Sequence, residues 1–71
     1  MLKYKFFEKT ADGTVYEFYP EGNRRAPGKV LIAGNEGKII EESKADIGNR
    51  YAYHAISGID RSNREGTVAW Y

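Results

Sequence analysis

The chain contains no cysteine and only one histidine, His54. The absence of cysteine excludes a disulfide framework, a zinc knuckle and a thiol nucleophile. A single histidine without cysteine would need several converging carboxylates to hold a metal ion. We therefore expect neither a metal site nor a bound cofactor.

Long apolar runs and an excess of one charge are also missing. No run approaches the ~20 residues of a membrane-spanning helix, and the N-terminus lacks the apolar stretch of a signal peptide. The 11 Lys and Arg residues against 10 Asp and Glu leave a net charge of +1, which falls short of the basic footprint of a nucleic-acid-binding protein. A charge this small also causes little repulsion between copies. We therefore expect no membrane partner, and nucleic acid only as a secondary candidate.

Aromatic residues, in contrast, are plentiful for the size of the chain. Its 71 residues predict one small domain, 1–71, and such a domain buries only about 60% of the surface that its unfolded chain exposes. Six Tyr, three Phe and one Trp are more than a single thin core layer easily hides. This surplus favours a second buried surface, most simply one between two subunits.

The N-terminal part of the chain predicts a β-hairpin. Residues 2–8 alternate in the manner of a strand, and residues 10–14 predict a tight turn with a glycine bulge. This turn pairs Thr10 with Thr14 and therefore Phe6 with Phe18, whereas a two-residue Asp-Gly turn would set two glutamates opposite each other. One face of the hairpin then carries Tyr4, Phe6, Tyr16 and Phe18.

Three further strands follow from the pattern. Residues 29–33 and 38–43 predict a second strand pair around the turn 34–37, and residues 67–71 predict a last strand. The stretch 20–27 is irregular, and its two prolines oppose a central strand there.

Between the fourth and the last strand, the period of the pattern changes to that of a helix about 15 residues long. Asp46 or Asn49 can cap its start, and Gly66 fits just past its end. The apolar stripe of this helix consists of Ala52, Ala55, Ile56 and Ile59. The opposite side carries Arg50, His54, Ser57, Arg61 and Arg64.

These elements predict an α+β fold, a mostly antiparallel five-stranded sheet with one amphipathic helix packed on one face. Four strands precede the helix and one follows it. The last strand returns beside the first strand or runs parallel to the fourth. Because one helix covers only one face, the other face stays open and carries Lys3, Lys5, Phe7, Glu17 and Tyr19.

The second half of the chain contains two motifs, Arg50-Tyr51-Ala52-Tyr53-His54-Ala55 and Gly66-Thr67-Val68-Ala69-Trp70-Tyr71. Both resemble a family of small hypothetical bacterial proteins, which share an Arg-Tyr-Ala-x-His-Ala helix start and a Gly-x-Val-Ala-Trp-Tyr C-terminus. A weaker similarity extends over residues 28–43. The resemblance implies a bacterial, cytoplasmic protein. It assigns no functional residue, because the family has no known function.

His54 is the one residue whose side chain titrates near neutrality, and Ser57 could hydrogen-bond to it from the same helix face. A hydrolase would also need an oxyanion hole and an acid that orients the imidazole. Asp60 lies about 120° around the helix from His54 and is poorly placed for that role. We therefore expect no catalytic residues and interpret His54 as a histidine of the helix surface or edge.

The surplus aromatic residues favour a binding role. If several of the surplus residues Phe7, Tyr19, Tyr53 and Tyr71 are exposed together they mark an interaction surface, and the alternative is that the loop 20–28 folds over them. The expected interface residues are Phe7, Tyr19 and Tyr71. The sequence thus predicts a non-catalytic interaction module that forms a homodimer or binds another protein through the open face. The secondary candidate is weak nucleic-acid binding by Arg50, Arg61 and Arg64, because arginine beside aromatic rings suits phosphate binding and base stacking.

Overall fold

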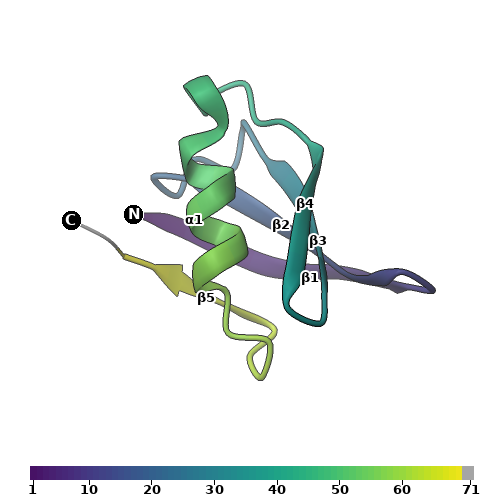
Figure 1. Cartoon of the computed structure of the whole chain (residues 1–71). Helices are drawn as coiled ribbons and strands as arrows, with labels where there is room; N and C mark the ends of the chain where they lie inside the picture. Colours follow the sequence, from purple (N-terminus) through teal and green to yellow (C-terminus); the bar gives the residue numbers. More distant parts are fainter. Residues whose placement is uncertain (70–71) are drawn as a thin grey trace.

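Five strands form one antiparallel sheet in the computed structural model, which describes residues 1–69 (Figure 1). The strands are β1 (Leu2–Thr10), β2 (Gly13–Pro20), β3 (Gly28–Ala33), β4 (Glu36–Glu41) and β5 (Glu65–Val68). Their order is β4-β3-β2-β1-β5, so the last strand lies beside the first, as one of the two expected placements had it. The helix α1 (Arg50–Gly58) covers one face of the sheet, which confirms the predicted α+β fold.

The hairpin of β1 and β2 closes with a shorter turn than the one we expected. Thr10 pairs with Gly13, and a bulge between Phe6 and Glu8 inserts the extra residue into β1. The Thr10 hydroxyl closes this turn, because it accepts a hydrogen bond from the Asp12 N–H and donates one to the Gly13 carbonyl, both at 3.2 Å. The expected pairs Thr10–Thr14 and Phe6–Phe18 are therefore wrong.

Gly13 is needed for a close approach between strands, and it does not occupy the bulge position that the sequence predicted for it. A Cβ atom on this residue would lie 2.6 Å from the Ile32 carbonyl oxygen and 2.9 Å from the Ala33 Cβ on β3. Glycine therefore lets β2 begin directly against β3 at this point.

The predicted aromatic face of the hairpin is confirmed despite the changed register. Tyr4 and Phe6 contact Tyr16 edge to face, with ring centroids 5.9 and 6.3 Å apart. The buried core between α1 and the sheet consists of Leu2, Tyr4, Tyr16, Phe18, Val30, Ile32, Ala52 and Ala55. The predicted helix stripe is also confirmed, because Ile56 and Ile59 pack against this core beside the two buried alanines.

Asp46 caps the start of α1. Its two carboxylate oxygens accept hydrogen bonds from the N–H groups of Tyr51 and Ala52, each at 2.9 Å. These N–H groups belong to the first turn, where no carbonyl of the helix itself is within reach. A short 3-10 turn (Ile47–Asn49) connects Asp46 to α1, and the Asn49 side chain donates to Glu42 instead of capping the helix.

α1 ends at Gly58 after nine residues, so the expected longer helix that reaches Gly66 is wrong. A Cβ atom on Gly58 would lie 2.6 Å from Cγ1 of Val68, which shows that the helix end packs directly against β5. The Asp60 N–H then donates to the Tyr4 hydroxyl at 3.2 Å and fixes the chain beside β1. Gly66 lies inside β5, opposite Tyr4, and not at a helix terminus.

The other two predicted strand boundaries shift toward the N-terminus. β4 begins at Glu36, because a two-residue turn of Gly34 and Asn35 replaces the longer turn expected at 34–37. β5 begins at Glu65 and ends at Val68, and the predicted strand residues Trp70 and Tyr71 lie outside the described part of the chain. Within residues 1–69, no helix is long and apolar enough to cross a membrane.

Candidate interaction surface

The sheet face opposite α1, called the open face below, is crossed by a row of charges whose sign alternates from strand to strand. In register order from β5 to β4, the row consists of Glu65, Lys5, Glu17, Lys29 and Glu41. Within it, Lys29 Nζ and Glu41 Oε2 form an ion pair at 3.7 Å. Opposite charges on neighbouring strands favour this register, and they neutralise one another across the face.

An apolar strip lies next to the charged row, toward the β1–β2 turn. It contains Phe7 at the bulge of β1, Val15 of β2 and Leu31 of β3, and the last two are paired in register. Val15 and Leu31 are only 3% and 9% exposed, although no helix covers this face. Phe7, in contrast, is 44% exposed, and Lys29 Nζ lies 4.3 Å from the centre of its ring. Phe7 is therefore the accessible apolar residue that the sequence predicted here.

Tyr19 was predicted to lie in the same interface, but it is only 6% exposed. The Arg24 guanidinium lies 5.0 Å from the centre of the Tyr19 ring. The Tyr19 hydroxyl donates a hydrogen bond to the Glu17 carboxylate at 2.9 Å. Burial and this hydrogen bond raise the pKa of Tyr19 above its usual value. The alternative, that the loop after β2 folds over the sheet, is thus correct at Tyr19. Tyr71, the third predicted interface residue, lies outside the described residues.

The two ends of the open face carry opposite charge. Where β1 begins, a hollow of about 260 Å³ is lined by Lys3, Lys5 and Arg24 together with Glu65. We call Lys3, Lys5 and Arg24 the cationic end. The loop residue Arg24 reaches this end only through the tertiary fold, because it is distant in the sequence from Lys3 and Lys5.

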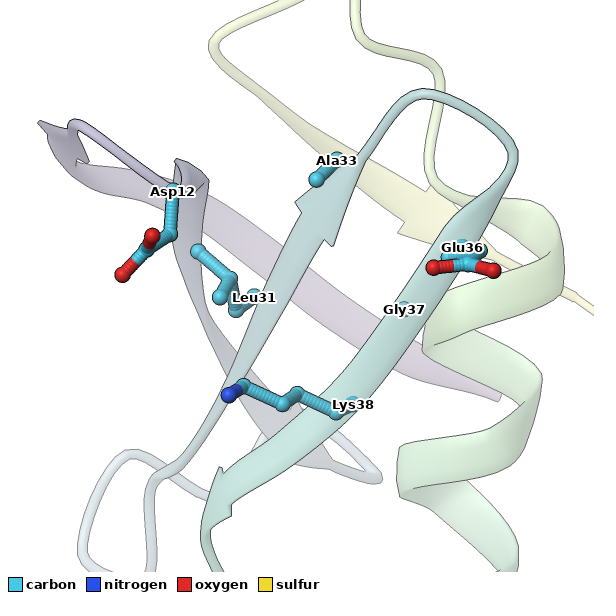
Figure 2. A pocket seen from close by; sticks show the side chains of 6 residues that line it. All are labelled: Asp12, Leu31, Ala33, Glu36, Gly37 and Lys38. Carbon is cyan, nitrogen blue, oxygen red and sulfur yellow. The ribbon is translucent and has the colours of Figure 1, made fainter.

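At the opposite end, where β1 turns into β2 and β3 into β4, a hollow of about 310 Å³ contains two carboxylates (Figure 2). Asp12 comes from the first turn and Glu36 from the start of β4, and together we call them the acidic end. Leu31 lies in the same hollow, and Lys38 extends over it from β4 toward β3. The open face thus combines an exposed aromatic ring with complementary charges at its two ends.

The predicted arginine stripe is not formed on the helix. Arg50 is the first residue of α1, but Arg61 and Arg64 follow the helix, because α1 ends at Gly58. The Arg64 guanidinium lies 4.4 Å from the centre of the Phe6 ring, where it packs against the edge of the core. The three arginines therefore do not share one helix face.

Ser57 and Asp60, the two residues considered as partners of the His54 imidazole, form other hydrogen bonds. The Ser57 hydroxyl shares its proton between the backbone carbonyls of Tyr53 and His54, at 3.1 and 3.3 Å. The Asp60 carboxylate accepts hydrogen bonds from the N–H and hydroxyl of Ser62, which lower its pKa. Among residues 1–69, no cluster of three His, Cys, Asp or Glu side chains is arranged to hold a metal ion.

The fold and this surface together define a class, a small α+β protein with one open sheet face. No protein-family model, no curated protein and no solved structure matches the chain. The resemblance to small bacterial proteins therefore stays a prediction from the two sequence motifs.

Proposed function

We propose that the protein is a non-catalytic interaction module whose open face binds the surface of another protein molecule, either a second copy or a different chain. The observation that carries this proposal is the 44% exposure of Phe7 on the open face, next to the buried Val15 and Leu31. Large aromatic side chains beside desolvated apolar residues are typical anchors of protein interfaces. Val15 and Leu31 supply such a floor next to Phe7, since both are already shielded from water.

The nucleic-acid alternative has weaker support. Its three arginines lie on two separate segments, and one of them packs on Phe6. The charged row of the open face has three carboxylates against two ammonium groups, which does not favour the phosphate backbone as a ligand. The open face is therefore favoured over the three arginines as the binding surface.

Photo-crosslinking at position 7 tests the proposed function. Phe7 is replaced by the photoreactive benzoylphenylalanine, and the matched control carries the same residue at Ile47, which is 90% exposed beside α1. We expect ultraviolet light to give covalent protein adducts at position 7 and not at position 47, either with the purified protein or in an extract of bacterial cells. The proposal is wrong if position 7 gives no adduct in either sample, or if both positions give the same adducts.

A further inference from the structure

The distribution of charge on the open face narrows the choice of partner. The cationic end and the acidic end lie at opposite ends of the strands, and the row between them alternates in sign. A surface with this polarity is complementary to a copy of itself turned end for end. The net charge of +1 adds almost no repulsion between two such copies.

We propose that the open face binds a second copy of this chain, with the two sheets face to face and their strands antiparallel. The two-fold axis then lies parallel to the sheets and perpendicular to the strands, between the charged row and the apolar strip. This inference rests on the proposed function, because it names the partner of the same surface.

This symmetry brings opposite charges together at the two ends and at two places beside the axis, while Glu17 and Lys29 come to lie over the partner's Val15 and Leu31. At the ends, Lys3 and Arg24 face the partner's Asp12. Near the axis, Lys5 faces the partner's Glu8 and lies over the partner's Phe7, an arrangement that suits a cation against an aromatic ring. At β4, Glu41 faces the partner's Lys38.

The other face-to-face arrangement, with parallel strands, is unfavourable. Its two-fold axis would run along the strands and exchange β1 with β3. Lys5 would then face the partner's Lys29, and the two cationic ends would meet. Like charges in contact across an interface cost several kcal/mol, so the antiparallel packing is the favoured one.

The size of the face predicts a weak dimer. The described part of the molecule measures 28 × 20 × 19 Å, so complete overlap of two faces would bury at most roughly 1,100 Å² on both partners together. That area lies at the lower limit of specific interfaces, so we expect dissociation in the micromolar range or weaker.

Sedimentation and light scattering over a concentration series test the inference, with charge exchanges at Lys3 and Asp12. We expect Lys3→Glu and Asp12→Lys each to weaken the dimer about tenfold, because each places like charges at both ends of the interface. The double variant restores the pair of residues 3 and 12 with its signs reversed but leaves Arg24 facing a lysine, so it should recover part of the affinity that each single variant loses. Arg50→Glu is the matched control, because it changes the net charge as much as Lys3→Glu but lies on α1.

The outcomes separate the inference from the proposed function. A mass of 8.1 kDa at every concentration up to about 1 mM overturns the second copy as partner, whereas adducts at position 7 in the cell extract would still support the interaction surface. A dimer in which the double variant is no stronger than the single ones overturns the antiparallel packing. If a charge exchange fails to fold, Lys3→Gln and Asp12→Asn replace it, and each is expected to weaken the dimer by a smaller factor.

Discussion

On the sheet face that has no helix, long cationic side chains lie over two aromatic rings, one of them buried and the other partly exposed. The Arg24 guanidinium covers Tyr19, and the Lys29 ammonium lies over Phe7. Such contacts shield the ring from water while the charge stays hydrated, and they contribute roughly 0.5–1 kcal/mol each at exposed sites. Long cationic side chains therefore do here, in part, what a second helix layer does in larger α+β proteins.

The hydroxyl of Tyr19 gives a pH-dependent test of this arrangement. Burial, and then the hydrogen bond to Glu17, raise its pKa above the usual 10.0. The neutral phenol is thus favoured by folding, so its contribution to stability is complete below pH 10 and is lost as the pH rises through the raised pKa. We expect the phenolate absorbance that disappears in Tyr19→Phe to form at a higher pH than that of an ordinary tyrosine.

Glu17→Gln is the control for this titration. It removes the carboxylate but leaves the ring buried, so the pKa of Tyr19 should fall part of the way back toward its usual value. Equal titration of Tyr19 with and without the Glu17 carboxylate would contradict the assigned hydrogen bond.

At the scale of the element, α1 depends on a residue outside it. The helix has only nine residues, too few to be stable by its own propensity in water. Asp46 supplies two acceptors to its first turn, and the core contacts of Ala52 and Ala55 hold it on the sheet. The Asp46 cap and the buried apolar side of α1 together therefore stabilise a helix that is too short to form by itself.

Replacing Asp46 tests the contribution of this cap. We expect Asp46→Ala to lower the free energy of unfolding by about 2 kcal/mol, because two N–H groups lose their acceptor near the buried start of the helix. The measurement is the midpoint of urea unfolding, with an unchanged dependence on urea as evidence of the same fold. Asp46→Asn keeps one acceptor oxygen and should lose less, whereas equal stability of Asp46→Ala and the original chain would show that the cap contributes nothing.

At the scale of the whole molecule, the outer edge of β4 and the open face would each produce a different dimer. The outer edge of β4 carries Glu36, Lys38 and Glu41, and the register of β4 is interrupted next to Lys29. Charged side chains and bulges on an edge strand oppose strand pairing between molecules. Face-to-face packing is therefore favoured over extension of the sheet.

Nuclear magnetic resonance distinguishes these two modes. With rising protein concentration, we expect the methyl signals of Val15 and Leu31 on the open face to shift. Those of Ile56, which lies on the core side of α1, should stay constant. Amide exchange along the outer edge of β4 should not change. Slower exchange in β4 without methyl shifts would instead indicate dimerisation through the edge.

The alternation of residues in β1 and β2 and the apolar spacing of Ala52, Ala55, Ile56 and Ile59 were sufficient to predict the sheet, the helix and their shared core. These patterns are local, since the period of 2 or 3.6 residues is a property of each element alone. The side of the sheet on which Phe7 lies follows from the same alternation, whereas the sequence left open whether Phe7 is exposed there. The sequence by itself therefore determined the fold class and which residues lie on which face.

The tertiary structure decided where the elements end and which residues become accessible. Gly13 of β2 packs against β3 close to the turn, and α1 ends at Gly58, where the helix packs against Val68 of β5. Likewise, Arg24 covers Tyr19 only because the fold brings the loop after β2 over the sheet. Lys3 and Asp12 lie at opposite ends of one face for the same reason, since the fold joins distant segments. Such contacts join residues far apart in the chain, and the free energy of packing that selects them has no signature in a local pattern.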